Sequence, residues 1–206
     1  MTACQQEFEV IEEPSENESV QAGSELTELL LGIASMDGSA DDIVDQSSCT
    51  LIILPATVKV GNTYLELTDE ADYQEVEKLL EEHPSASVEI QYPVDIWKVN
   101  FHRYTVKVEQ ELFAHQNYCK NGGRFISCLD FQYPIKVSEY NIETQRSSVT
   151  VISNDQDLYE TVVALSKERI VSFVYPFNLI DADGNILEVT QQEELLSKIK
   201  QYKGCK

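Results

Sequence analysis

Apolar and polar residues alternate along four segments of this chain, and a proline lies near the middle of each segment. The apolar members lie three residues and one residue before and after each proline: Ile52, Leu54, Ala56, Val58, Ile90, Tyr92, Val94, Ile96, Phe131, Tyr133, Ile135, Val137, Phe173, Tyr175, Phe177 and Leu179. Polar residues such as Thr57, Gln91 and Lys136 lie between them. A period of two residues is typical of a β-strand that buries one face. The pattern therefore predicts four strands.

The four prolines mark a repeat. They belong to the pairs Leu54-Pro55, Tyr92-Pro93, Tyr133-Pro134 and Tyr175-Pro176, which are 38, 41 and 42 residues apart. Regular spacing of this size indicates tandem supersecondary units. Because proline has no N–H to donate, each strand must lie at an edge, a bulge or a bend where its proline occurs. We therefore expect open hairpins and no continuous central sheet.

Each proline-containing strand is followed by a turn, a return strand and a helix. Gly61-Asn62 and Asp183-Gly184 are hairpin turn signals. The pairs Ser153 with Gln156 and Thr190 with Glu193 predict capping boxes at two helix starts. Return strands are expected at 64–67, 104–108, 149–152 and 186–189. The sequence thus predicts an α+β fold of four tandem β-β-α repeats.

The N-terminal part of the chain differs in composition. The first 58 residues contain neither Lys nor Arg, and residues 5–23 are rich in acidic residues, Ser and Gln. Such a composition buries too little apolar surface to fold by itself, so this stretch is interpreted as a flexible acidic tether. Ser24 is a candidate N-cap for a short helix whose apolar stripe would be Leu26, Leu29, Leu30 and Ile33.

Five cysteines complete the organisation. Cys49 and Cys128 each precede a first strand, whereas Cys119 and Cys205 each follow a helix. This symmetry predicts two pseudo-symmetric modules and two disulfides in an oxidising compartment. One pairing joins Cys49 to Cys119 and Cys128 to Cys205; the other, which we favour, joins Cys119 to Cys128 and Cys49 to Cys205. The expected divisions are 1–23 (lipobox remnant and tether), 24–48 (helical segment), 49–127 (repeats 1 and 2) and 128–206 (repeats 3 and 4).

The odd cysteine, Cys4, follows two small residues in Thr2-Ala3-Cys4. This tripeptide resembles the end of a lipobox, in which the cysteine becomes the lipidated N-terminus of a bacterial lipoprotein. The alternative is an ordinary start at Met1. Residues 5–9 resemble the acidic signal that exports lipoproteins to the cell surface in the Bacteroidota. We therefore expect a lipid anchor on Cys4, because two or more acyl chains give stable membrane attachment.

The segment from Cys128 to Val137, with its Tyr133-Pro134-Ile135 centre, resembles the repeats of uncharacterised surface lipoproteins of flavobacteria. The resemblance covers residues 24–206. It implies an outer-membrane lipoprotein exposed at the cell surface, and it supplies no catalytic residues. The second repeat departs most from the pattern, between Trp97 and Arg103, which leaves its hairpin geometry open.

Charge and sequence motifs argue against several classes of function. A formal charge of −21 repels phosphate backbones, which excludes nucleic-acid binding. Asp181, Asp183 and Asn185 resemble the start of a calcium loop, but Gln192 stands where the bidentate Glu is needed, so a plain hairpin turn is the better interpretation. No cysteine or histidine spacing matches a zinc site, and no nucleophile motif occurs. We expect no cofactor, no metal and no enzymatic activity.

A binding surface is the remaining expectation. Trp97 lies four residues after Pro93, and the alternation that buries Ile96 places Trp97 on the outer face of the strand. An outward Trp can anchor a protein partner or stack on a sugar ring. The candidate surface consists of Trp97, Gln91, Asp95, Gln132, Lys136 and Asn178. The favoured hypothesis is a non-enzymatic protein-interaction module, an accessory subunit of an outer-membrane assembly or transport complex. The alternatives are a glycan-binding or adhesive lipoprotein and, less favoured, a hydrolase with a hidden site.

Overall fold

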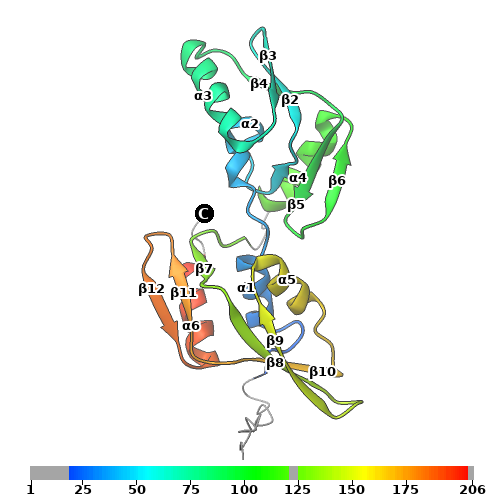
Figure 1. The fold of residues 1–206 in the computed structure, drawn as a ribbon, viewed down its shortest axis with the longest axis vertical. Coiled ribbons are helices and arrows are strands. Elements are labelled where there is room, and N and C mark those ends of the chain that lie inside the picture. The colour runs from blue at the N-terminus through cyan, green and yellow to red at the C-terminus, as the bar shows by residue number, and fades with distance from the viewer. Residues whose placement is uncertain (1–18, 121–124, 204–206) are drawn as a thin grey trace, which may run out of the picture. The chain divides into compact units, whose positions relative to one another are not determined.

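The structure is a computed structural model that describes residues 19–120 and 125–203 (Figure 1). It is a mixed α+β fold with four antiparallel sheets of three strands each. The chain divides into two compact units. The first unit contains residues 30–128, and the second contains residues 19–29 and 129–203. The division falls within helix α1 (Glu25–Ile33).

The first unit contains two sheets, ordered β3-β2-β4 and β1-β5-β6. Its elements are η2 (Ser39–Asp41), α2 (Asp42–Asp45), β1 (Thr50–Ile52), β2 (Ala56–Val60), β3 (Thr63–Leu67), η3 (Glu70–Asp72), α3 (Tyr73–Glu82), β4 (Val88–Ile90), β5 (Val94–Lys98), β6 (Arg103–Val106) and α4 (Glu109–Lys120).

The second unit also contains two sheets, ordered β12-β11-β7 and β10-β8-β9. Its elements are β7 (Leu129–Phe131), β8 (Ile135–Asn141), β9 (Arg146–Ile152), α5 (Asp155–Val163), β10 (Arg169–Phe173), β11 (Phe177–Asp181), β12 (Ile186–Val189) and α6 (Gln192–Tyr202).

Strands are exchanged between hairpins inside each unit. In the first unit, β1 pairs with β5 and β4 pairs with β2. In the second unit, β7 pairs with β11 and β10 pairs with β8. Each three-stranded sheet is thus a hairpin completed by the strand that precedes the other hairpin's proline. Because both of these strands are donated, neither hairpin can form its complete sheet without the other.

The prolines lie where the chain passes from one sheet to the next. Pro55, Pro93, Pro134 and Pro176 each follow a cis peptide bond and fall between the end of one strand and the start of the next. The expectation that one strand runs through each proline is therefore wrong. A proline cannot donate to a ladder, so the hydrogen-bonded strand ends before it and a new strand begins in a different sheet.

The alternation of apolar residues is nevertheless observed in the structure. Of the sixteen apolar positions around the prolines, eleven are buried, five are half-buried and none is exposed. The core of the first unit includes Val58 and Ile96, which have no exposed surface. In the second unit, Phe131 stacks on Phe173 with ring centroids 6.0 Å apart. The period-two pattern therefore identified core positions on both sides of the break.

The helix caps differ in detail from the predicted ones. Ser24 caps α1 as expected, with the N–H of Thr27 donating to its Oγ at 3.2 Å. At α5, the N-cap is Asn154, whose side chain accepts from the N–H of Asp157 at 2.8 Å. Ser153 instead donates its N–H to the Asp157 carboxylate. The predicted capping box was therefore one residue too early in the sequence.

The same shift occurs at α6, where Thr190 uses Glu194 instead of Glu193. The N–H and Oγ1 of Thr190 both donate to Glu194 Oε2, at 2.8 and 2.9 Å. The helix begins one residue later than predicted, after the N-cap Gln191, so the reciprocal partner also lies one residue later. These hydrogen bonds hold the pKa of Glu194 at about 2.

Candidate functional site

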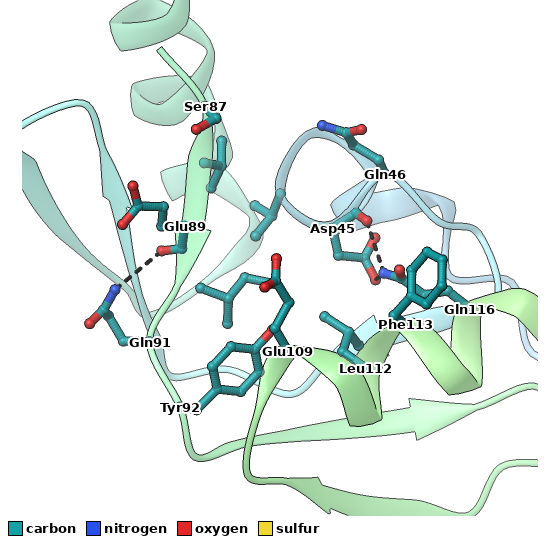
Figure 2. A pocket seen from close by; sticks show the side chains of 13 residues that line it. Asp45, Gln46, Ser87, Glu89, Gln91, Tyr92, Glu109, Leu112, Phe113 and Gln116 are labelled. Carbon is teal, nitrogen blue, oxygen red and sulfur yellow. Dashed lines mark hydrogen bonds between the residues drawn. The ribbon is translucent and has the colours of Figure 1, made fainter.

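A pocket of about 520 Å³ lies in the first unit between β4, α2 and α4 (Figure 2). Its lining residues are Val44, Asp45, Gln46, Ser87, Val88, Glu89, Ile90, Gln91, Tyr92, Glu109, Leu112, Phe113 and Gln116. This volume lies within the range typical of ligand pockets, roughly 300–1,000 Å³. We call it the acidic pocket, for the carboxylates on its wall.

Local sequence explains how the walls form. Strand β4 is an edge strand that pairs only with β2, so its other side is open to the pocket. On α4, Glu109, Leu112, Phe113 and Gln116 lie at i, i+3, i+4 and i+7. Residues at this spacing share one face of a helix. That face forms the opposite wall.

The pocket combines apolar and acidic groups. Val44 and Leu112 are buried, while Val88 and Ile90 are half-buried, which gives the pocket an apolar base. Three carboxylic acids, Asp45, Glu89 and Glu109, also line it, with no lysine, arginine or histidine among the lining residues. Figure 2 shows the carboxylate of Glu109 in the middle of the pocket. Glu89 has one basic neighbour outside the lining, Lys59, whose Nζ is 3.3 Å from its Oε2.

Asp45 joins the pocket wall to the rest of the first unit. Its Oδ2 accepts from Thr50 Oγ1 at 2.6 Å and from Gln116 Nε2 at 3.3 Å. Its Oδ1 accepts from the N–H of Ser47 at 2.9 Å. Burial raises the pKa of Asp45 to about 6, despite these hydrogen bonds. The Asp45 side chain therefore fixes α4 against α2 and places Gln116 in the wall.

A second buried acid, Asp41, lies close to Asp45 but does not line the pocket. Its Oδ2 accepts from the N–H of Ile52 at 2.7 Å, which satisfies a donor on the edge of β1. Burial, followed by the charge of Asp45, raises the pKa of Asp41 to about 8. Both acids attach segment 38–48 to strand β1.

No specific signal in the sequence marks these two acids as buried. Segment 37–48 is rich in Asp and Ser, like the predicted tether, and it has no clear helical or strand period. Such a composition normally marks exposed loops. Here a glycine permits the close approach, since a Cβ on Gly38 would lie 2.0 Å from the carbonyl oxygen of Thr50.

The second hollow, of about 420 Å³, lies where the segments around Pro55 and Pro93 meet. Gln91 and Tyr92 line both hollows. Asp95 accepts hydrogen bonds from Arg103 Nη2 and Thr105 Oγ1. The Arg103 hydrogen bond is the main reason why the pKa of Asp95 is below its ordinary value. The Asp95 carboxylate is thus held by groups of the chain itself.

The six residues of the predicted surface fall into two sets. Trp97, Gln91 and Asp95 lie in the first unit, and Gln132, Lys136 and Asn178 lie in the second. Trp97 is 37% exposed, whereas its neighbour Ile96 has no exposed surface, so Trp97 has the outward position that parity predicts. Trp97 lines neither hollow.

In the second unit, Asn178 Nδ2 donates to Gln132 Oε1 at 3.0 Å, and Lys136 is exposed. Gln132 follows β7 and Asn178 lies on β11 in the same sheet, whereas Lys136 lies on β8 in the other sheet. Their role in binding stays a prediction.

The cysteines are only partly described. Cys49 and Cys128 are disulfide-bonded. The side chain of Cys119, and Cys4 and Cys205 entirely, lie outside the described residues, so no complete pair is described. The pairing and the lipidation of Cys4 stay predictions.

The Asp183-Gly184 turn is described fully. Asp181 Oδ1 accepts from the N–H groups of Asp183 and Asn185, at 3.0 and 2.8 Å. These bonds make the plain hairpin turn that the sequence favoured. Within the described residues, no three His, Cys, Asp or Glu side chains gather as metal ligands. In the same residues, no helix has the length and apolar character needed to cross a membrane.

Comparisons of the chain with protein-family models, with curated proteins and with solved structures find no match.

Proposed function

We propose that this chain is a non-enzymatic interaction module that binds a basic, partly apolar segment of a protein partner in the acidic pocket. The observation that carries the proposal is the composition of that pocket, which joins an apolar base to Asp45, Glu89 and Glu109 without a basic lining residue. Lysine and arginine match such a site, because they bury an apolar stem and keep a charged end near carboxylates.

The charges favour a cation of this kind over other ligands. A chain with a formal charge of −21 repels anionic polymers at long range and attracts basic surfaces. Inside a partly enclosed pocket, the attraction between opposite charges is stronger than in bulk water, because the effective dielectric constant is lower. Phe113, which is 56% exposed at the wall, adds apolar contact area.

The chemistry of the lining favours binding over catalysis. Nucleophilic catalysis needs a nucleophile with a base within hydrogen-bond reach. Ser87 and Tyr92 are the hydroxyl groups of the lining, and no histidine lies beside them there. The carboxylate with a raised pKa, Asp45, is already engaged by Ser47, Thr50 and Gln116.

Calorimetric titration with a peptide of alternating Leu and Lys, acetylated and amidated at its ends, tests this function. Glu109→Gln removes a pocket charge, and we expect roughly fivefold to tenfold weaker binding, about 1–1.4 kcal/mol. The matched control is Glu77→Gln, because Glu77 is exposed on α3 and does not line the pocket. Equal affinities of the two variants, or equal binding of a peptide with Glu in place of Lys, would reject the pocket as the site.

We also propose that the chain is located at the cell surface. It would be a lipoprotein of the outer membrane and an accessory subunit of an assembly or transport complex there. The support is the Thr2-Ala3-Cys4 tripeptide and the resemblance of Tyr133-Pro134-Ile135 and its flanks to flavobacterial lipoprotein repeats. Mass spectrometry of the N-terminal peptide from the native host tests the lipid on Cys4. An unmodified Cys4 after a retained Met1 would refute it.

For the fold, we propose four tandem β-β-α repeats in two pseudo-symmetric modules. The support is that the exchange of β1 and β4 in the first unit is repeated by β7 and β10 in the second.

Trp97 supports a second candidate function, glycan binding. The side chain is 37% exposed on the outer side of β5, where its ring can stack on a sugar. Affinity electrophoresis in gels that contain a neutral polysaccharide tests this function, with Trp97→Ala compared with Tyr64→Ala. Tyr64 is 63% exposed in the same unit and serves as the aromatic control. If the polysaccharide still slows the migration of both variants, Trp97 is not the residue on which the sugar stacks.

A further inference from the structure

The second hollow of the first unit is lined by two rows of side chains, one from each sheet. Strand register and main-chain hydrogen bonds define the rows as Ile53, Asp95 and Thr105 from sheet β1-β5-β6, and Gln91, Thr57 and Glu66 from sheet β3-β2-β4. All six residues line the hollow, whose volume of about 420 Å³ lies within the range typical of ligand pockets. Two sheets that are separate in hydrogen bonding thus contribute equally to one concave surface.

Equivalent main-chain hydrogen bonds fix the two rows. The N–H of Ile53 donates to the carbonyl oxygen of Asp95 at 2.8 Å. The N–H of Gln91 donates to the carbonyl oxygen of Thr57 at 2.9 Å. Thr57 and Asp95 each precede a core residue with no exposed surface. Because successive side chains of a strand point to opposite faces, the hollow lies on the outer faces of both sheets.

The charges in this hollow nearly balance. Its charged side chains are Glu66, Asp95 and Arg103. The Asp95 carboxylate accepts from Arg103 and Thr105, so it is already paired with a cation of the chain. The acidic pocket, in contrast, has three carboxylic acids and no basic lining residue. In the second hollow a cation meets Arg103 and an anion meets Glu66, whereas a neutral polar ligand is repelled by neither.

The polar groups of the lining match the hydroxyl groups of a ligand. A carboxylate only accepts hydrogen bonds, a guanidinium only donates them, and a threonine hydroxyl does both. A ligand hydroxyl is donor and acceptor at once, so it can bond to each of these groups. Each oxygen of Asp95 accepts one hydrogen bond from the chain and keeps a further acceptor position. Hydrogen bonds to ionised groups of this kind are stronger than those between neutral groups.

Apolar rings accompany the polar groups. Tyr92, Pro55 and Pro93 line the hollow. Trp97 is the register partner of Arg103, and it lies two residues after Asp95 on the same face of β5, about 7 Å along the strand. Sugars present hydroxyl groups at the edge of the ring and C–H groups on its faces, which aromatic rings cover. The hollow and Trp97 together therefore offer both kinds of contact that a sugar needs.

We propose that the second hollow is a subsite that holds one ring of a neutral oligosaccharide while Trp97 stacks on the neighbouring ring. Asp95 and Glu66 accept hydrogen bonds from the sugar hydroxyls, and Arg103 and Thr57 donate to their oxygens. The inference rests on the second candidate function, glycan binding, and adds to it the polar subsite that selects a neutral sugar. The subsite does not use the carboxylates of the acidic pocket.

NMR titration of the isotopically labelled full chain with cellotetraose, maltotetraose and mannotetraose tests the subsite. We expect at least one of these neutral sugars to bind and to shift the amides of Thr57, Glu66 and Thr105. Thr57→Val keeps the shape of the side chain but removes its hydroxyl, so binding should weaken roughly threefold to tenfold, the value of one hydrogen bond. The matched control Thr63→Val makes the same change at an exposed residue of β3 that lines neither hollow, and it should bind like the wild type.

The possible results separate the subsite from glycan binding as a whole. If none of the three sugars binds, both the subsite and the glycan-binding function are rejected. If a sugar binds and Trp97→Ala weakens it, but Thr57→Val does not, glycan binding stands and the subsite is overturned. Equal weakening by Thr57→Val and Thr63→Val would also overturn it.

Circular dichroism verifies that the threonine variants fold. If Thr57→Val does not fold, Glu66→Gln decides, because Glu66 is exposed on the edge strand β3 and its change removes only a charge. The proposal requires Glu66→Gln to bind the sugar at least threefold more weakly than the wild type. An unchanged affinity would overturn it.

Discussion

At the scale of single residues, the buried acid Asp41 should make stability depend on pH. Its pKa is raised to about 8 in the folded chain, mainly by burial, from an ordinary value of 3.8. The folded state therefore binds more protons than the unfolded state between these values, and the stabilisation by Asp41 is lost as pH rises from about 4 through 8. We expect Asp41→Asn to be less sensitive than the wild type to this rise, because an amide stays neutral.

Melting temperatures measured across this pH range test the effect. The comparison with Asp41→Asn is necessary because several other acids, such as Asp72 and Asp181, have lowered pKa values and act in the opposite direction. Parallel curves for wild type and variant would show that Asp41 is not the titrating group.

A second prediction at this scale concerns Gly38. A Cβ at this position would lie 2.0 Å from a backbone oxygen, that of Thr50, so the segment and β1 would have to separate. Overpacking of this kind typically costs about 1–3 kcal/mol, so we expect Gly38→Ala to unfold at lower denaturant concentration. An unchanged midpoint would mean that segment 38–48 is held more loosely than the contact implies.

At the scale of elements, core strands and edge strands should respond differently to the same kind of truncation. Leu179 in β11 has no exposed surface, and Leu179→Ala should cost about 2–5 kcal/mol. Ile186 in the neighbouring strand β12 is 59% exposed, and Ile186→Ala should cost less than about 1 kcal/mol. Denaturant unfolding measures both values. Similar losses would contradict the assigned faces.

Some features of the strands and helices could be predicted from the sequence, and others could not. Period-two alternation identified the apolar faces, because burial of one strand face is a local property. It did not show that Ile52 and Ala56 belong to different sheets, because strand pairing joins residues far apart in the chain. The capping errors at Ser153 and Thr190 were shifts of one residue, which a single sequence rarely resolves. The acidic pocket was missed because α2, β4 and α4 meet only after folding.

At the scale of the whole molecule, charge should limit stability. A formal charge of −21 creates self-repulsion that salt screens. We expect added monovalent salt to raise the melting temperature, by about 2–4 °C for each kcal/mol of repulsion removed. Calorimetry in low and high salt measures this change. A fall in melting temperature would show that ion pairs such as Arg169 with Glu139 outweigh the repulsion.

Recognition of a basic segment in the acidic pocket is the central claim, and NMR titration of the isotopically labelled chain with the Leu-Lys peptide tests it most directly. We predict that the largest amide shifts occur at Glu89, Glu109 and Gln116, and that salt weakens them. Shifts spread evenly over acidic helix faces such as α3, or no shifts at all, would contradict the claim.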